Sequence, residues 1–452
     1  MSFLSPSKQK IQCNSSSFDT SSTTSQEDGS DGFPASKWQR LFDANCLCRR
    51  SVQQKLSRIE SGQLTIVDRS GARELGHVGD LDLTGTITVH DPRFYYYLIL
   101  GGSLGAAEAY IRGYWDSLDL TAVMRVLACN ANVLSRVEKG IPQMLQPLGS
   151  LVYRLHSNSR AGSQRNIAAH YDLSNDFFSL MLDPTMTYSS GIYPSPNSSL
   201  EEASTEKYDR ICRKLNLCPT DHVLEIGTGW GGFAEHAVRH YGCRVTTTTI
   251  SEQQHSYAAK RFAEAPLNDR ITLLKKDYRD LSGKYDKLVS VEMIEAVGEK
   301  FLPGFFAKCS ALLRPEGMML LQAITIPDHR YDHYRKSLDF IQHYIFPGGF
   351  LPSMGKITSC LQQSTDLTFF QAEDFGPHYA RTLKAWRNNF WNQINNVRSL
   401  GFDNRFIRTW HYYLSFCEAG FLERQIGVSQ VLLTKPLCRR HALLASAEVQ
   451  ET

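Results

Sequence analysis

Residues 221–241 read DHVLEIGTGWGGFAEHAVRHY, and this stretch decides the fold. A short, largely apolar run ends at Ile226, four glycines follow within six residues, and a helix-like stretch begins at Phe233. The first part is typical of a buried strand and the last part of a helix. Glycine lets the backbone turn tightly and approach a ligand closely. The stretch therefore predicts a strand, a ligand-binding loop and a helix, in that order.

The spacing of Gly227, Gly229 and Gly232 also satisfies the dinucleotide pattern G-x-G-x-x-G. A dinucleotide site should place an acidic residue at the end of the next strand, where it holds a ribose hydroxyl. That strand, RVTTTTI, ends in threonines. Glu225 before the loop gives E-x-G-x-G-x-G instead, which resembles the S-adenosylmethionine (SAM) loop of class I methyltransferases. The resemblance implies that Asp277, at the end of the third strand, contacts adenine.

Strand-like and helical stretches alternate between residues 166 and 437. The strands are HVLEIG, RVTTTTI, ITLLKKD, YDKLVSVEM, GMMLLQAITI, LTFFQAEDF and SQVLLTK. Helical stretches separate the first five, which is typical of an α/β fold with a parallel sheet. The last two are closer to hairpin order and predict an antiparallel edge. We therefore predict a Rossmann-like class I SAM-methyltransferase domain with a seven-stranded, mainly parallel sheet.

The length of 452 residues allows two to four domains. Residues 1–36 are rich in Ser and Thr and predict a disordered tail. Residues 37–134 contain alternating strand patterns (QLTIVD, TGTITVHD) and two apolar helical stretches, which predict a small α+β domain. Residues 135–165 carry five Lys or Arg against one Glu, so they form either a solvated linker or a strip facing anionic lipid headgroups. Residues 438–452 look like a tail.

The composition excludes several classes of protein. Hydrophobic residues make up 42% of the chain and charged residues 21%, with a net charge of +3, which gives no basis for predicting nucleic-acid binding. The 11 cysteines are scattered without a Cys-x-x-Cys spacing, so we expect no metal site and a reduced, intracellular compartment. No apolar run is long enough to span a bilayer. We expect a cytoplasmic protein.

Motifs on both sides of the glycine loop narrow the substrate. HYDLSNDFF and MLDPTMTYSSGIY precede the loop, and TISEQQ, KDYRDL, SVEMIEAVG, FIQHYIFPGG and HYARTLKAW follow it. In this order they resemble the family of cyclopropane-fatty-acyl-phospholipid synthases and mycolic acid cyclopropane synthases. That family uses SAM to methylate or cyclopropanate cis double bonds of lipid acyl chains. The resemblance covers the whole catalytic region and, more loosely, the N-terminal domain.

The resemblance implies a SAM site around the glycine loop. Tyr188 and Ser189 would cover SAM, and the loop would approach its methionine part. Gln254 would serve the ribose region as a neutral amide. The full set of implied SAM-binding residues is Tyr188, Ser189, Glu225, Gly227, Gly229, Gly231, Thr248, Thr249, Gln254, Asp277 and Tyr278.

The chemistry of the family requires a base as well as a methyl donor. Methyl transfer to an alkene leaves a carbocation, and ring closure needs proton loss beside an apolar, water-free tunnel. In the family a bound bicarbonate is that base, held by a backbone amide at a Cys and by Glu, His and Tyr. The matching positions here are Ser190, Glu295, Gln322 and Tyr379, and Cys417 matches a family cysteine near the site.

Three departures from the family pattern bear on the product. Ser190 replaces the Cys, Gln322 replaces the His, and Ala296 replaces a His after Glu295. Glutamine donates hydrogen bonds but carries no charge, so bicarbonate dependence stays open. The leading hypothesis is a cyclopropane ring formed in unsaturated phospholipids. Alternatives are a methyl or methylene branch, another lipid or a small amine as acceptor, or a catalytically weak SAM-fold protein that binds lipid.

The resemblance also bears on partners and on two aromatic segments. It implies peripheral membrane association through the N-terminal domain, and a homodimer. HYDLSNDFF would form a lid over SAM and contact the acyl chain. WRNNFW places Trp386, Phe390 and Trp391 at near-helical spacing, which fits the protein core or the lining of an acyl tunnel.

Overall fold

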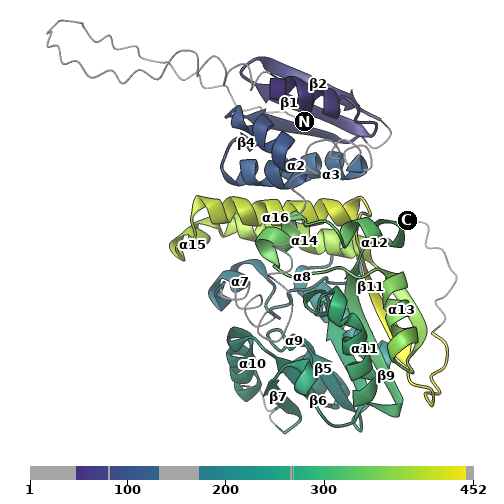
Figure 1. Cartoon of the computed structure of the whole chain (residues 1–452). Helices are drawn as coiled ribbons and strands as arrows, with labels where there is room; N and C mark the ends of the chain where they lie inside the picture. The colour runs from purple at the N-terminus through teal and green to yellow at the C-terminus, as the bar shows by residue number, and fades with distance from the viewer. Residues whose placement is uncertain (1–46, 80–81, 132–172, 265–266, 268, 444–452) are drawn as a thin grey trace, which may run out of the picture. The chain divides into compact units, whose positions relative to one another are not determined.

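The computed structural model describes residues 47–79, 82–131, 173–264, 267 and 269–443. The expectations for the tail at 1–36, for the linker at 135–165 and for residues 170–172 of HYDLSNDFF lie outside these ranges. Residues 45–452 cluster as one compact unit. Within it, the described residues build two sheets, one of four strands and one of seven (Figure 1).

The smaller sheet belongs to the N-terminal domain. Its strands are β1 (Gly62–Asp68), β2 (Gly71–His77), β3 (Thr84–Val89) and β4 (Trp115–Asp116), in the order β2-β1-β3-β4. A helix over residues 47–56, α2 (Arg93–Ile111) and α3 (Leu120–Cys129) complete the domain. The sequence predicted β1 and β3 but not β2, because most β2 side chains are exposed and show no apolar alternation. The two predicted helical stretches form α2, which kinks where Gly102 leaves helical geometry.

The larger sheet contains all seven strands predicted from the sequence. They are β5 (His222–Ile226), β6 (Arg244–Thr249), β7 (Ile271–Lys275), β8 (Tyr285–Val291), β9 (Leu313–Thr325), β10 (Thr368–Asp374) and β11 (Gly427–Thr434), in the order β10-β11-β9-β8-β5-β6-β7. The pairs β9–β8, β8–β5, β5–β6 and β6–β7 are parallel. Strand β11 runs antiparallel to both β9 and β10. The predicted edge is therefore present, although helices rather than a hairpin turn connect its two strands.

Helices separate the strands of this sheet. They are α7 (Asn175–Met181), α8 (Leu200–Leu215), α9 (Gly232–Tyr241), α10 (Glu252–Glu264), α11 (Leu302–Leu312), α12 (Asp328–Tyr334), α13 (Met354–Ser364), α14 (Gly376–Asn392), α15 (Ile394–Ser399) and α16 (Asn404–Leu422), with short turns η2 (Tyr278–Asp280), η3 (Ile294–Ala296), η4 (Glu299–Phe301) and η5 (Ile341–Ile345). Local sequence signals explain where one of these helices, α8, begins and ends. Helix α8 starts with a capping box between Ser199 and Glu202 and ends at Asn216 in the left-handed conformation.

Helix α16 joins the N-terminal domain to the catalytic domain. It packs against α14 on the catalytic side and against α2 and α3 on the other. The guanidinium of Arg408 donates to the backbone carbonyl of Trp115 at 2.7 Å and contacts the carboxylate of Asp116. Of the WRNNFW aromatics, Trp386 and Phe390 are fully buried, as expected for core residues, whereas Trp391 is partly exposed.

Two further findings concern the ends and the surface of the chain. Residues 438–443, expected to be part of a tail, contact the catalytic domain, where the Arg440 guanidinium donates to the carbonyl of Arg213. Within the described part of the chain, none of the helices combines the length and the apolar character that crossing a membrane requires.

Candidate active site

A cavity of about 330 Å³ lies at the carboxyl ends of β5, β6 and β8. This edge is where α/β sheets bind their ligands. The glycine loop and the residues after β6 and β7 supply polar lining. The segment around η5 and helices α14 and α16 supply apolar and aromatic lining, namely Ile341, Phe346, Phe350, Leu351, Leu383, Tyr413, Phe416 and Phe421. One continuous space can therefore receive a polar nucleotide and an apolar chain.

The glycines of the loop have different tasks. Gly227, Gly229 and Gly231 all have positive φ values, of 105°, 53° and 89°. Gly227 and Gly229 line the cavity, and a Cβ on Gly229 would meet no protein atom within 4 Å. Gly231 does not line the cavity, and its Cβ would lie 2.7 Å from the ring of Phe262. Packing against α10 therefore accounts for the glycine at position 231, and its contact with SAM stays a prediction.

The other residues implied for SAM binding all line the cavity: Tyr188, Ser189, Glu225, Thr248, Thr249, Gln254, Asp277 and Tyr278. Their side chains are held by neighbours. The Thr249 hydroxyl donates to Gln254 Oε1 at 2.9 Å, and the Arg279 guanidinium donates to both carboxylate oxygens of Asp277. The open loop and this polar lining fit SAM.

Two buried ionisable groups lie beside this polar part. Burial raises the pKa of Glu225 to about 8, while the hydroxyl of Thr247 and the charge of Lys207 oppose the rise. Lys207 is fully buried, and burial lowers the pKa of its ammonium to about 8. Its Nζ donates to Ser189 Oγ at 2.6 Å. Lys207 was not among the residues predicted from the sequence, although its helical spacing from the buried Ala203 and Ile211 places it on the inner face of α8.

The centre of the site is a carboxylate that the sequence analysis did not select. Glu292 follows β8 directly and lines the cavity. Its Oε1 accepts hydrogen bonds from the Ser190 backbone N–H at 2.9 Å and from Gln322 Nε2 at 2.7 Å. Its Oε2 accepts the hydroxyl of Tyr379 at 2.7 Å. Three of the four groups expected to hold bicarbonate therefore converge on Glu292.

The positions of these donors exclude bicarbonate from the expected site. Glu292 and Tyr379 line the cavity, whereas Ser190 and Gln322 are completely buried behind them and do not. An added anion would have to displace the Glu292 carboxylate from its donors and lie beside its charge. The residues present do not fit bicarbonate, and the expectation that Ser190 and Gln322 contact it is wrong.

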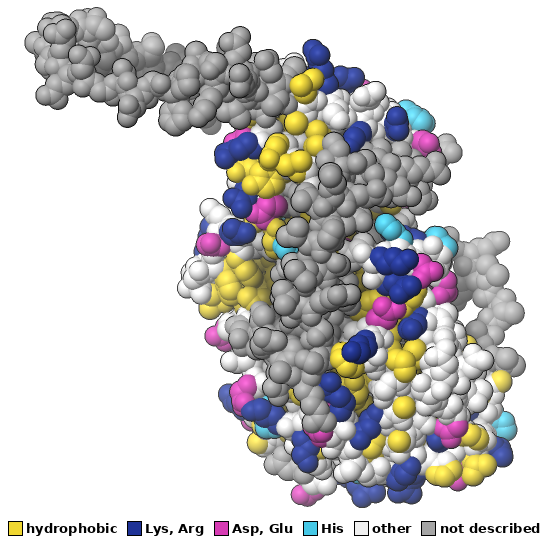
Figure 2. Space-filling view, in the orientation of Figure 1, with side chains coloured by type: hydrophobic (Ala, Val, Ile, Leu, Met, Phe, Trp, Pro, Cys, Tyr) yellow, Lys and Arg dark blue, Asp and Glu magenta, His cyan; other side chains and the backbone are white. Residues whose placement is uncertain are grey.

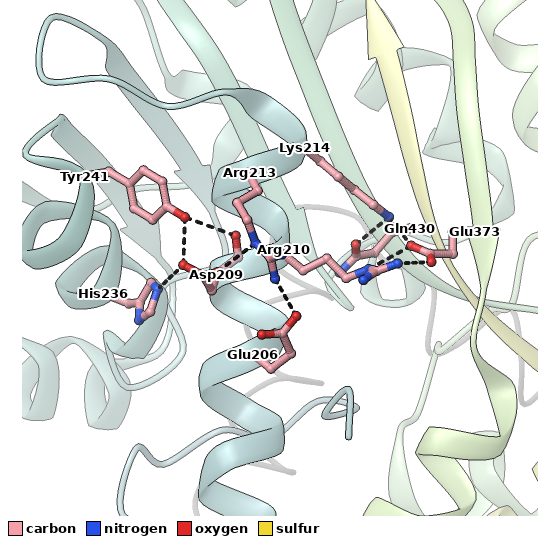
Figure 3. A network of polar contacts seen from close by, with 9 residues as sticks. All are labelled: Glu206, Asp209, Arg210, Arg213, Lys214, His236, Tyr241, Glu373 and Gln430. Carbon is pink, nitrogen blue, oxygen red and sulfur yellow. Dashed lines mark hydrogen bonds and ion pairs between the residues drawn. The ribbon is translucent and has the colours of Figure 1, made fainter. Parts of the chain in front are cut away.

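A chain of amides sets the orientation of Gln322. Gln322 Oε1 accepts from Gln430 Nε2 at 3.1 Å, which directs the Nε2 of Gln322 toward Glu292. Gln430 Oε1 accepts from Lys214 Nζ at 2.8 Å, and Lys214 pairs with Glu373 at 2.6 Å. Figure 3 shows the outer part of this chain, where Lys214 from α8 reaches between Gln430 and Glu373. An uncharged donor at position 322 is thereby fixed in one orientation.

Glu295 also lines the cavity, but it does not share the donors that converge on Glu292. Its Oε1 accepts the backbone N–H of Ile324 at 2.6 Å, and its Oε2, also buried, has no hydrogen-bond partner among the described residues. Burial and, secondarily, the charge of Glu292 raise the pKa of Glu295 to about 8. Burial also raises the pKa of Glu292, but hydrogen bonds from Tyr379, Gln322 and Ser190 favour its charged form. The pair thus favours a neutral Glu295 beside a charged Glu292.

The remaining candidates line or support the cavity. Cys417 lines it, and burial raises the pKa of its thiol, so it does not present a thiolate. In the described part of HYDLSNDFF, Phe177 and Phe178 are fully buried and do not line the cavity. Phe178 packs on the rings of Tyr188 and Trp230, so these two side chains act in the core rather than as a lid. Across the described ranges, no group of three or more potential ligand side chains could hold a metal ion.

Comparisons with known proteins identify the family to which the chain is similar. The family described as "Mycolic acid cyclopropane synthetase" matches residues 158–431. The chain is 40% identical over 345 residues to the tuberculostearic acid methyltransferase UfaA1 of Mycobacterium tuberculosis, covering 74% of this chain and 79% of that protein. It is 36% identical over 362 residues to the cyclopropane-fatty-acyl-phospholipid synthase of Escherichia coli, covering 77% and 87%.

A solved structure of a relative adds a ligand. The mycolic acid cyclopropane synthase CmaA1, complexed with SAH and CTAB, superposes with a TM-score of 0.57 at 31% identity. The match covers 60% of this chain and 98% of that one.

Proposed function

The chain belongs to the mycolic acid cyclopropane synthetase family of SAM-dependent methyltransferases, and from that premise we propose that it alkylates cis double bonds in the acyl chains of phospholipids. The observation that carries the proposal is the single cavity in which the SAM-binding loop, an aromatic and aliphatic lining and the Glu292 carboxylate meet. An amine acceptor would need few of these apolar groups.

The chain's own residues provide the conditions for this reaction. When bound, SAM supplies an electrophilic methyl group that the π electrons of an alkene can attack. Phe346, Phe416 and Phe421 would exclude water from the resulting positive carbon. A negative carboxylate at Glu292 would stabilise that charge and take up the proton that must leave.

The product we propose is a cyclopropane ring. Proton loss from the transferred methyl group closes the ring, whereas proton loss after migration of the charge leaves a methylene branch. The 36% identity to a relative named cyclopropane-fatty-acyl-phospholipid synthase supports the ring. A branched product is the second candidate, and the 40% identity to a relative named tuberculostearic acid methyltransferase supports it. Both products add the same mass, and a saturated methyl branch would require a further reductant.

The surface of the N-terminal domain supports docking on a membrane. Tyr96 on α2 and Leu118 after β4 are exposed, and the guanidiniums of Arg93 and Arg112 lie over the rings of Tyr114 and Tyr97. Tyrosine and arginine suit the interface between lipid headgroups and acyl chains. Figure 2 shows hydrophobic side chains interspersed with Lys and Arg on the face in view. We propose that the enzyme is cytoplasmic and reaches its lipid by peripheral association.

The test uses the full chain, SAM labelled in its methyl group, and liposomes of one phospholipid with either cis-unsaturated or saturated chains. We expect label in the acyl chains of the unsaturated lipid alone. NMR of the extracted lipid separates the products, because a cyclopropane has high-field ring protons and a methylene branch has olefinic ones. Label in neither lipid, with SAM binding intact by calorimetry, would refute the proposed function.

A further inference from the structure

The arrangement at the end of β8 points to a base that is part of the chain. Resting on the function proposed above, we infer that the Glu292 carboxylate is itself the proton acceptor, in place of a dissolved anion. In this step a C–H bond of the alkylated chain breaks, and its electron pair closes the ring or forms the new double bond. The proton goes to a carboxylate oxygen of Glu292, and water restores the carboxylate after the product leaves.

The hydrogen bonds of Glu292 support this role. A carboxylate and a bicarbonate ion present the same planar pair of oxygens to donors. The Ser190 N–H, the Gln322 amide and the Tyr379 hydroxyl bind those two oxygens at 2.7–2.9 Å. Because Ser190 and Gln322 are sealed from the cavity, they can act on a substrate only through Glu292. They are positioning residues, and Glu292 is the carboxylate through which they reach the cavity.

The backbone conformation of Glu292 also indicates that its side chain is needed. Its φ is +48°, a left-handed conformation that strains non-glycine residues. Such strain persists at positions where the side chain is needed. The conformation is held by the hydrogen bond from the Glu292 N–H to the carbonyl of Gln322 at 2.8 Å. Glycine would relieve the strain here, so the presence of glutamate indicates that its side chain has a task.

The two glutamates of the site favour different charge states. The charges and titratable groups that face Glu292 are Lys207 from α8, Tyr379 from α14 and Glu295 from η3. Lys207 and the Tyr379 hydroxyl stabilise a charged Glu292, and a neutral Glu295 avoids a second negative charge beside it. The site thus holds one carboxylate ready to accept a proton.

The experiment compares the wild-type chain with Glu292→Gly and the near-isosteric Glu292→Gln, each in bicarbonate-free buffer and with added potassium bicarbonate. We expect bicarbonate to leave the wild-type rate unchanged. Both variants should lose activity by about 10²–10⁴-fold without it. Glu292→Gly opens the three donors to a small anion, so bicarbonate should restore part of its activity. Glu292→Gln keeps the donors filled and should stay inactive.

Two readouts do not depend on turnover. NMR of isotopically labelled bicarbonate should detect binding to Glu292→Gly and not to the wild type, and calorimetry should find SAM affinity retained in both variants. Glu292→Gly leaves three donors without their carboxylate, so bicarbonate should raise the unfolding midpoint of this variant and not that of the wild type.

Failure of the inference differs from failure of the proposed function. A wild-type enzyme that leaves the lipid unlabelled refutes the function. A wild-type enzyme that labels lipid but depends on bicarbonate, or a Glu292→Gln variant within tenfold of the wild-type rate, overturns the inference alone.

Discussion

Two glycines in the same loop provide a matched pair of substitutions, Gly231→Ala and Gly229→Ala. Both residues have left-handed backbone conformations, so alanine strains both by about 1–2 kcal/mol. At both sites alanine also restricts the unfolded chain more than glycine does, and this offsets about 0.4–1 kcal/mol of the strain in the free energy of unfolding. Their surroundings differ, because a Cβ on Gly231 would lie 2.7 Å from the ring of Phe262, whereas a Cβ on Gly229 meets nothing within 4 Å.

The difference between the two variants therefore isolates the crowding against Phe262. Overpacking of this kind costs about 1–3 kcal/mol, so Gly231→Ala should be less stable than Gly229→Ala by about that free energy of unfolding. Gly229 lines the cavity, and its added methyl group would enter the space expected for SAM. Gly229→Ala should weaken SAM binding about tenfold, which corresponds to about 1.4 kcal/mol.

Denaturant titration followed by circular dichroism measures the first effect, and calorimetry with SAM measures the second. The double variant Gly231→Ala with Phe262→Leu serves as a control, since a smaller, flexible side chain should recover part of the lost stability. Equal unfolding midpoints for the two single variants would contradict the packing argument. A stable Gly231→Ala variant that binds SAM tenfold more weakly would return Gly231 to the cofactor site.

Two further predictions concern groups around Glu292. Gln430→Glu keeps the acceptor for Lys214 but cannot donate to Gln322, so Gln322 loses its fixed orientation. We expect kcat to fall about three- to tenfold while SAM affinity stays unchanged. An unchanged kcat would exclude the amide chain from catalysis. Glu295 keeps its proton up to a pKa of about 8 in the folded chain but releases it near its ordinary pKa of 4.5 when unfolded. Wild-type stability should therefore fall as pH rises between these values, and Glu295→Gln should lack this part of the decrease. Denaturation midpoints across that range check this, and parallel pH dependences would contradict it.

The sequence predicted the catalytic fold well because its strongest signals are local. A buried strand, a glycine loop and a helix follow one another within residues 221–241, and each can be identified from periodicity and backbone requirements. The same signals located all seven strands of the large sheet. The resemblance to a family, and not these local signals, supplied the candidate site residues, most of which line the cavity. The local signals missed β2, whose exposed side chains carry no apolar alternation.

The choice between Glu292 and Glu295 was decided only by the tertiary structure. Both glutamates stand in SVEMIEAVG, and the resemblance to a family pointed to the second. Only one of them accepts hydrogen bonds from Ser190, Gln322 and Tyr379. These donors come from segments that are far apart in the chain and that meet only when β8, β9 and α14 pack together. The left-handed backbone of Glu292 likewise arises from a bond to the neighbouring strand.

Residue types and their order thus established a methyl-donor site on a parallel sheet, because strands, loops and helix caps are encoded by nearby residues. Both Glu292 and Glu295 line the cavity and are buried. Which of them receives the hydrogen bonds of Ser190, Gln322 and Tyr379, and therefore keeps its charge more readily, came from long-range packing. Desolvation and hydrogen-bond geometry depend on every element surrounding a group, and short sequence patterns do not contain that information.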